Sequence, residues 1–158
     1  MQRPFLFLIA SVTAAGLLTG CAQHGGAPAP EKIDMESAKK LRMPIVIYHV
    51  GVQQGEDGTS RPVVYFVNSS DKPVDLATFY VTGKTKDGQT VTLWADDYEK
   101  VVPGKPSNNG VLGGSWRGTA VECVEIKKAD IHIDGIDYRY SEENIEQLFQ
   151  DPSINRCP

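Results

Sequence analysis

From Pro44 onward, the pattern of apolar and polar positions is typical of β-strands. Residues 45–50 (IVIYHV) and 63–67 (VVYFV) are nearly continuous runs of β-branched and aromatic side chains, which predict central strands of a sheet. Turn-forming residues fill the segment between them, 51–58 (GVQQGEDG), and the next cluster, 68–73 (NSSDKP). The pattern therefore predicts short strands separated by turns.

The phase of the apolar residues predicts the loop length of the next hairpin. Val81 and Leu93 belong to alternating segments on either side of an Asp-Gly pair. A two-residue loop would pair Val81 with Trp94 and place Val81 and Leu93 on opposite faces, because side chains alternate with a period of two. We therefore predict a three-residue loop at 86–88, with Gly88 in the left-handed region and Val81 opposite Leu93.

A change of phase further along the chain predicts a second hairpin. Ile131 and Ile133 are in phase with each other, whereas Ile136 and Tyr138 occupy the opposite phase, and Asp134-Gly135 lies at the switch. A two-residue loop pairs Ile133 with Ile136 and Ile131 with Tyr138, which keeps all four side chains on one face. A β-bulge is the alternative, and the hairpin is favoured.

Two segments have helical features. Ser141 is a candidate N-cap for a helix whose apolar stripe consists of Ile145, Leu148 and Phe149. Residues 33–43 (IDMESAKKLRM) are ambiguous, and a short helix is one interpretation. The succession of short strands followed by one late helix predicts a mainly β protein, an antiparallel sandwich with a short C-terminal helix.

Several short motifs follow one another between Val64 and Tyr138. They are residues 68–74 (NSSDKPV) leading into a strand, the Asp87-Gly88 turn, residues 102–104 (VPG), and Trp116 before Cys123. Together they resemble the immunoglobulin-like domains of small bacterial surface lipoproteins. The resemblance implies an immunoglobulin-like β-sandwich and no particular activity. The chain lacks the Cys…Trp…Cys order of antibody domains.

The N-terminal segment has a different pattern. Arg3 precedes a run of roughly 15 mostly apolar residues, shorter than the about 20 that a membrane-spanning helix needs, and the run ends in Leu18-Thr19-Gly20-Cys21. This layout predicts a cleaved signal peptide over residues 1–20. Its end resembles the lipobox of bacterial lipoproteins, which implies a lipid on Cys21. Ala22, in place of Asp, implies the outer membrane, facing the periplasm. An ordinary secretory signal is the alternative.

The rest of the chain divides into a tether and one domain. Residues 22–32 (AQHGGAPAPEK) predict a flexible to semi-extended tether that spans roughly 30 Å. We therefore expect a lipidated tether at 21–43, including the ambiguous segment, and a sandwich domain at 44–158. Without residues 1–20 the chain has 138 residues, of which 15 are basic and 20 acidic. The net charge of −5 and the lack of a basic block argue against nucleic acid as a partner.

The three cysteines are Cys21, Cys123 and Cys157. If Cys21 carries lipid, the other two remain in an oxidising compartment, in which a pair of thiols usually oxidises. Their disulfide would contribute about 3–4 kcal/mol by closing the loop between them. A metal-binding or redox pair is the alternative, but the chain has no C-x-x-C motif and no nearby histidine cluster. We predict a structural disulfide that holds the C-terminus to the body.

The sequence carries no catalytic signature. It lacks the G-x-S-x-G motif of serine hydrolases. His49 belongs to an apolar strand and is predicted to be packed or at an edge, whereas His132 shares a polar face with Asp130 and Asp134. Two ligands fall short of a metal site, and residues 96–99 (DDYE) are more typical of a solvated loop than of a calcium site. We therefore expect no catalytic residues, no metal and no cofactor.

The best candidate binding surface is the glycine-rich segment 107–118 (SNNGVLGGSWRG). Trp116 and Arg117 are residue types enriched in binding hot spots, and Asn108 and Asn109 add polar groups beside them. The favoured interpretation of the segment is nevertheless a long connection between strands in which Trp116 is buried in the core.

These observations predict a role in binding. The first hypothesis is a non-enzymatic lipoprotein of the outer membrane that contacts an envelope protein through its loops or an open sheet edge. The alternative is an immunity or inhibitor protein whose negative charge suits a basic toxin or lytic enzyme. An enzyme or small-ligand carrier is the third and least favoured hypothesis, since no convergent set of polar residues is evident.

The anchor can be tested by replacing one atom. Cys21→Ser removes the thiol that would carry the lipid, so we expect the full chain to leave the membrane fraction after cell lysis, because acyl chains supply its membrane affinity. Immunoblotting of the membrane and soluble fractions measures this. Retention of the variant in the membrane fraction would contradict the lipid anchor.

Overall fold

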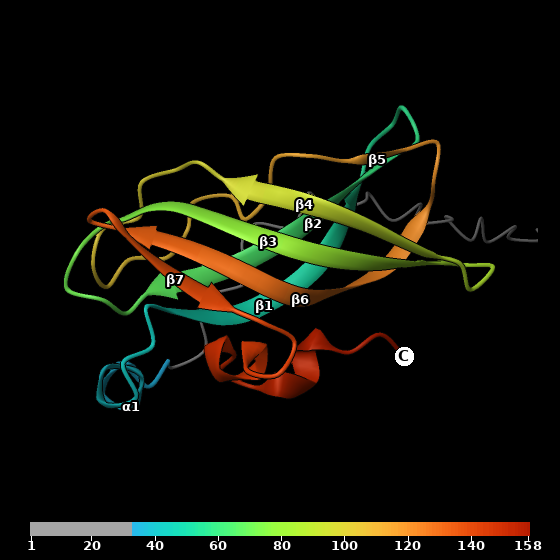
Figure 1. The fold of residues 1–158 in the computed structure, drawn as a ribbon. Helices are drawn as coiled ribbons and strands as arrows, with labels where there is room; N and C mark the ends of the chain where they lie inside the picture. The colour runs from blue at the N-terminus through green and yellow to red at the C-terminus, as the bar shows by residue number, and fades with distance from the viewer. Residues whose placement is uncertain (1–32) are drawn as a thin grey trace, which may run out of the picture.

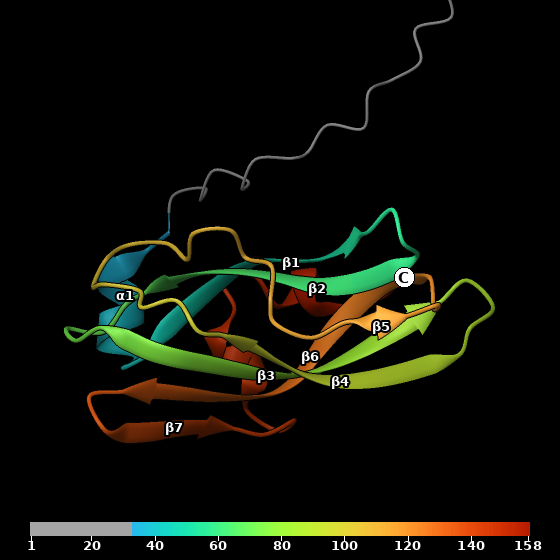
Figure 2. The ribbon, with the colours of Figure 1, turned by 90° about the horizontal axis from the view of Figure 1, so that it is seen from above.

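The protein is a two-layer β structure. The computed structural model describes residues 33–158, so the predicted signal peptide, Cys21 and residues 22–32 of the predicted tether lie outside the described residues. Two antiparallel sheets pack face to face (Figures 1 and 2). This confirms the prediction of a mainly β sandwich, and its immunoglobulin-like character stays a prediction.

One sheet has three strands and the other has four. The first has the order β1-β2-β5, with β1 at Ile45–Gln54, β2 at Thr59–Asn68 and β5 at Trp116–Arg117. The second has the order β4-β3-β6-β7, with β3 at Val74–Thr85, β4 at Thr90–Asp97, β6 at Val121–Ile133 and β7 at Ile136–Tyr140. The helical elements are α1 at Met35–Lys40 and the 3-10 helices η1 at Ile145–Leu148 and η2 at Pro152–Asn155.

The core lies between the two sheets. Ile47 and Phe66 point inward from the first sheet, and Phe79 and Ile126 from the second, and all four are fully buried. The rings of Phe66 and Phe79 meet across the interface with 6.2 Å between their centroids. Burial of each such side chain contributes about 1.5–3 kcal/mol, so this interface is the main source of stability.

Both predicted hairpins are confirmed. Val81 lies opposite Leu93, and Gly88 has a φ of 80°, as the three-residue loop requires. Ile133 lies opposite Ile136 across the two-residue turn, whose Asp134 and Gly135 have φ values of 50° and 78°. Positive φ at both positions identifies a type I′ turn, which matches the twist of the strands it joins. The first hairpin of the chain has a shorter connection than the predicted loop at 51–58, because β1 extends to Gln54 and β2 begins at Thr59.

The ambiguous segment before β1 contains α1. The side chain of Asp34 accepts a hydrogen bond from the Ser37 N–H at 3.0 Å and so caps the helix. Ala38 is buried, and the Met43 carbonyl after the helix accepts a hydrogen bond from the Ser69 hydroxyl at 2.6 Å. The helix is therefore tied to the sandwich.

One open side of the sandwich is closed by the irregular segment 101–117. Along the edge of β2 beyond its short pairing with β5, the Val64 N–H donates to Gly110 O at 2.7 Å and the Ser107 N–H donates to Phe66 O at 2.8 Å. The segment then crosses to the edge of β4, where Gly113 and the backbone of Asp96 exchange two hydrogen bonds. The segment therefore satisfies strand edges that would otherwise be unpaired.

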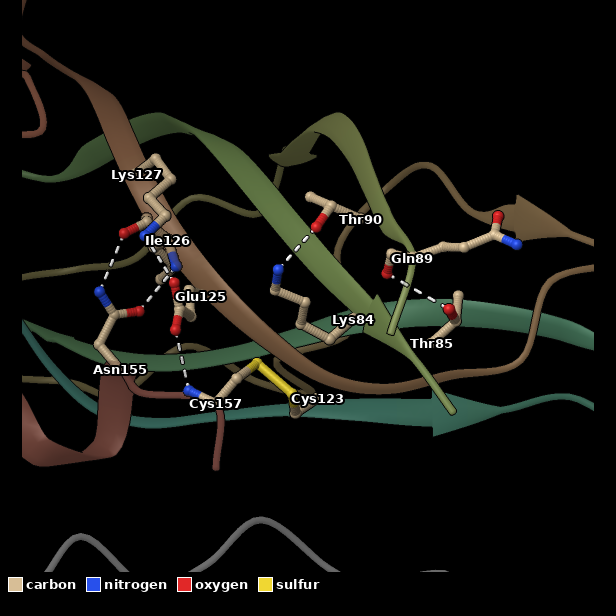
Figure 3. The surroundings of a disulfide bond; sticks show 10 residues. All are labelled: Lys84, Thr85, Gln89, Thr90, Cys123, Glu125, Ile126, Lys127, Asn155 and Cys157. Atoms are coloured by element: carbon tan, nitrogen blue, oxygen red, sulfur yellow. Dashed lines mark hydrogen bonds and ion pairs between the residues drawn. A yellow bond between two sulfur atoms is a disulfide. The ribbon is translucent and has the colours of Figure 1, made fainter. Parts of the chain in front are cut away.

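The opposite side is closed by the C-terminal segment (Figure 3). The side-chain amide of Asn155 bonds both backbone groups of Ile126, accepting from its N–H at 2.6 Å and donating to its carbonyl at 2.9 Å. Two residues later, Cys157 forms a disulfide with Cys123, and its N–H donates to the Glu125 carboxylate at 2.9 Å. The predicted disulfide is confirmed.

The C-terminal helical segment differs from the prediction. Ile145, Leu148 and Phe149 are all buried, as the stripe predicts. They lie in and just after η1, a 3-10 helix with Asn144 as its N-cap, so Ser141 does not begin one continuous helix. Phe149 is extended and bridges to Ile47 of β1, since burial there requires the chain to leave the helix and join the sheet edge.

The disulfide generates a stability prediction. Its cysteines are 34 residues apart, so the paired Cys123→Ser and Cys157→Ser variant should lose about 3–4 kcal/mol of unfolding free energy, because the unfolded chain gains loop entropy. Urea titration followed by circular dichroism measures the loss. Equal stability of the variant and the oxidised parent would contradict a role for this bond in closing the sandwich.

Candidate functional site

The predicted binding loop does not present its tryptophan to solvent. Trp116 belongs to β5, where it lies opposite Ser60 of β2, and it is only 8% exposed. Its Nε1 donates to the Thr92 carbonyl at 3.4 Å. Trp116 is therefore a core residue, which confirms the interpretation of this segment as a connection between strands and removes Trp116 from the candidate binding loop. Arg117, Asn108 and Asn109 are exposed, but they lack this aromatic anchor.

Two glycines of this segment allow close packing. A Cβ at Gly110, whose φ is 62°, would come within 2.8 Å of the Tyr65 ring. A Cβ at Gly114, whose φ is 100°, would come within 3.3 Å of Leu93. Both positions require the left-handed region and close approach, which glycine alone meets at low cost. At these two positions, glycine allows the segment to pack closely against Tyr65 and Leu93.

The two histidines of residues 33–158 occupy unrelated surroundings. His49 packs against Tyr65, with 5.7 Å between ring centroids, and burial lowers the pKa of its imidazole. His132 Nδ1 lies 2.8 Å from the carboxylate of Asp137, its cross-strand neighbour, and this hydrogen bond lowers the pKa of Asp137. The partner of His132 is therefore Asp137, which lies on the same polar face of the sheet as Asp130. Among residues 33–158, no three histidine, cysteine or acidic side chains gather as a metal site would require.

The acidic residues at the end of β4 have ordinary partners. The carboxylate of Asp96 accepts hydrogen bonds from the Thr78 and Tyr98 hydroxyls, each at 2.7 Å, and the bond from Tyr98 raises the pKa of that phenol. The carboxylate of Asp97 accepts from the Glu99 N–H at 3.0 Å, while burial raises the pKa of Asp97. These side chains cap local backbone and hydroxyl groups and do not converge on a common centre.

The strongest exposed feature lies on the outer face of the four-stranded sheet. Trp94, Tyr80 and Lys128 lie side by side on β4, β3 and β6, because Tyr80 is opposite both of the others in the strand register. The rings of Tyr80 and Trp94 are 5.1 Å apart at their centroids, and Lys128 Nζ lies 5.7 Å from the Tyr80 ring centroid. We call these three residues the Trp94 platform.

The platform is open and its frame is polar. Trp94 is 50% exposed although it belongs to a strand, whereas tryptophan is usually buried. The neighbouring row on one side contains Thr78 and Asp96, and the row on the other contains Thr82 and Thr92. An apolar centre within a polar frame is the arrangement of a protein-binding patch.

Sequence reasoning missed this platform although one signal pointed to it. Tyr80 and Trp94 occupy the polar phase of their strands, opposite in phase to the buried Phe79 and Val81. Large aromatic residues in the outward phase of a strand are candidates for a binding face. Their proximity depends on the hairpin register, which the loop at 86–88 sets.

Comparisons with known proteins add no family to this description. No protein-family model, no curated protein and no solved structure matches the chain. In the part of the chain that the structure describes, no helix has the length and apolar character needed to cross a membrane.

The half-buried carboxyl of Asp97 generates a prediction about pH. Its pKa in the folded protein is raised above 3.8, so ionisation favours the unfolded state as the pH rises through the folded-state pKa. Asp97→Asn should therefore raise the melting temperature by about 1–2 °C at pH 7, and by nothing well below pH 3.8, at which both side chains are neutral. Calorimetric scans at both pH values check this. A gain that is equal at both pH values, or a loss at pH 7, would contradict it.

Proposed function

We propose that this chain is a lipoprotein anchored at Cys21 in the outer membrane, facing the periplasm. We further propose that it acts without catalysis, as a module that binds another envelope protein through the Trp94 platform. The lipobox residues Leu18-Thr19-Gly20-Cys21 support the anchor. The exposure of Trp94 within a polar frame is the observation that supports the binding role.

The geometry of the platform favours binding of a folded protein. Trp94, Tyr80 and Lys128 come from three adjacent paired strands, so their positions are set by the sheet before any partner arrives. A preorganised face loses little conformational entropy on association. Tryptophan and tyrosine are among the residues that most often dominate interface energy when a partner excludes water from them.

Charged residues of both signs surround the platform. Lys84 donates to the Thr90 hydroxyl at 2.6 Å, and Lys127 pairs with Glu125. Burial alone would raise the pKa of Glu125, but the hydrogen bonds from Lys127 and from the Cys157 N–H outweigh it and lower that pKa. Glu125 therefore stays ionised at neutral pH, and the face offers both signs of charge to a partner. Such a rim contributes specificity more than affinity.

The segment between the proposed anchor and the domain is long enough for the domain to bind a partner near the membrane. Twelve residues lead from Cys21 to Ile33, where the described domain begins. An extended chain of this length spans about 36 Å. The domain can then stand clear of the lipid headgroups while it stays close enough to meet other membrane-attached proteins.

Site-specific photocrosslinking of the full chain in cells tests the binding role. A photoreactive residue at Thr92, which is exposed beside the platform, should give one discrete covalent adduct. A photoreactive residue at Leu41, which is 71% exposed on another part of the domain, is the matched control and should not. Trp94→Ala should reduce the Thr92 adduct by roughly tenfold or more, since loss of a hot-spot side chain costs about 2 kcal/mol or more.

The identity of the adduct separates the two binding hypotheses. A resident envelope protein supports the assembly role, and a toxin or lytic enzyme supports the inhibitor role. Equal adducts from Thr92 and Leu41, or a Thr92 adduct that Trp94→Ala leaves unchanged, would reject the platform as the binding face.

A further inference from the structure

The edge strand β7 has no backbone partner on its outer side within the described residues. By contrast, segment 101–117 covers the edge of β2 at several residues and bridges β4 at Asp96, and the C-terminal segment bridges β1 at Ile47 and covers part of β6. Strand β7 pairs with β6 on one side. Within the described residues no strand pairs with its other side, and Figure 2 shows it at the margin of the fold. A bare strand edge is a template for pairing with another chain.

The backbone of β7 offers hydrogen-bonding groups at alternate residues. In a two-residue hairpin the residues that flank the turn, Ile133 and Ile136, form a hydrogen-bonded pair. Because the pattern alternates, Tyr138 and Tyr140 also direct their backbone groups toward β6. Asp137 and Arg139 therefore direct theirs outward, to the side on which the described structure has no strand.

The side chains of β7 form two distinct faces. Ile136 and Tyr138 share the inward face of the sheet with the core residue Ile131, yet they are 56% and 37% exposed. Asp137 and Arg139 occupy the outward face and are also exposed. The strand thus carries apolar surface on one face and one charge of each sign on the other.

We propose that β7 is a self-association surface, at which a second copy of this chain pairs antiparallel with the first. A two-fold axis through Tyr138 places Asp137 of each copy opposite Arg139 of the other. The same axis places Ile136 opposite Tyr140 and the two Tyr138 rings opposite each other. This register forms two ion pairs and an apolar contact on the inward face. It also gives the outward backbone groups of Asp137 and Arg139 hydrogen-bonding partners.

The charges select this register over its neighbours. Paired residues must share a face, so the pairing can shift only in steps of two residues. Each such step moves the two-fold axis by one residue. An axis through Asp137 places the two aspartates opposite each other, and an axis through Arg139 places the two arginines opposite each other. Like charges directly opposite are destabilising. Of these three registers, only the one centred on Tyr138 pairs opposite charges.

The dimer is expected to be weak in solution and is independent of the proposed binding function. Two five-residue strands bury much less than the roughly 1,200 Å² of a standard stable interface. Attachment of both copies to one membrane would raise their effective concentration and favour pairing. Pairing joins two four-stranded sheets edge to edge, so both Trp94 platforms lie on the same face of the combined sheet.

Complementary charge variants test the register. In Asp137→Arg both charges of the strand are positive, and in Arg139→Asp both are negative, so each variant repels its own copy. When full-length chains of the two variants are co-expressed with different tags, opposite charges again face each other at both positions. We expect co-purification of the mixed pair to equal that of differently tagged wild-type chains, and each variant with itself to fall by about tenfold.

Engineered cysteines supply a second test that does not disturb these charges. In the proposed register the Cα atoms of the two Tyr138 residues are about 4.5 Å apart, which suits a disulfide. The two Ile136 residues are about 13 Å apart, which does not. On non-reducing gels, full-length Tyr138→Cys should form a covalent dimer, and the matched control Ile136→Cys should remain monomeric.

Both experiments bear on the same pairing of strands. Selective crosslinking at position 138, with association restored by mixing the charge variants, supports the proposed dimer. Equal crosslinking at both positions, no crosslinking at position 138, or association that neither charge variant weakens would overturn it. Circular dichroism of each variant verifies folding, and if one charge variant unfolds, crosslinking of the two cysteine variants alone decides whether β7 pairs in this register.

Discussion

The fold depends on closing the two open sides of a sandwich whose sheets differ in width. The inner faces of the sheets bury Phe66, Phe79 and their neighbours, and this burial is secure only if water is kept from the flanks. Neither flank is closed by a regular strand along its length. One is closed by segment 101–117 and the other by the C-terminal segment that Asn155 and the Cys123–Cys157 disulfide hold in place.

This constraint explains which surfaces remain for function. The residues of segment 107–118 that look like a binding loop are used to seal strand edges, and Trp116 fills the space between the sheets. On the outer face of the four-stranded sheet, Trp94, Tyr80 and Lys128 take no part in closure, and Trp94 stays half-exposed. Strand β7 lies beyond the reach of both closing segments, which leaves its edge available for a second copy.

Local features of the sequence predicted much of the fold. The hairpins at 86–88 and 134–135 follow from turn chemistry combined with the two-residue period of strands. The disulfide follows from the cysteine count once Cys21 is assigned to lipid. In each case the decisive information lies within a short segment or in the residue types themselves.

Other features of the structure depend on contacts between segments that are distant in the sequence, and the sequence alone did not determine them. The sequence left two interpretations of Trp116 open, because its burial depends on the edges of β2 and β4, which lie far from it in the sequence. Phe149 leaves its helix because β1 offers an edge to join. The Trp94 platform brings together residues from three strands, and the free edge of β7 depends on strand order. Such features become visible only when strand neighbours are known.

Amide hydrogen exchange on the dilute protein tests the central claim that irregular segments close the sandwich. Closure by these segments predicts slow exchange at the N–H groups of Val64 and Ile126, which donate to Gly110 and to the Asn155 side chain, and fast exchange at Asp137 and Arg139 on the free edge. Fast exchange at Val64 and Ile126, with rates like those of Asp137 and Arg139, would contradict closure of the flanks by segment 101–117 and the C-terminal segment.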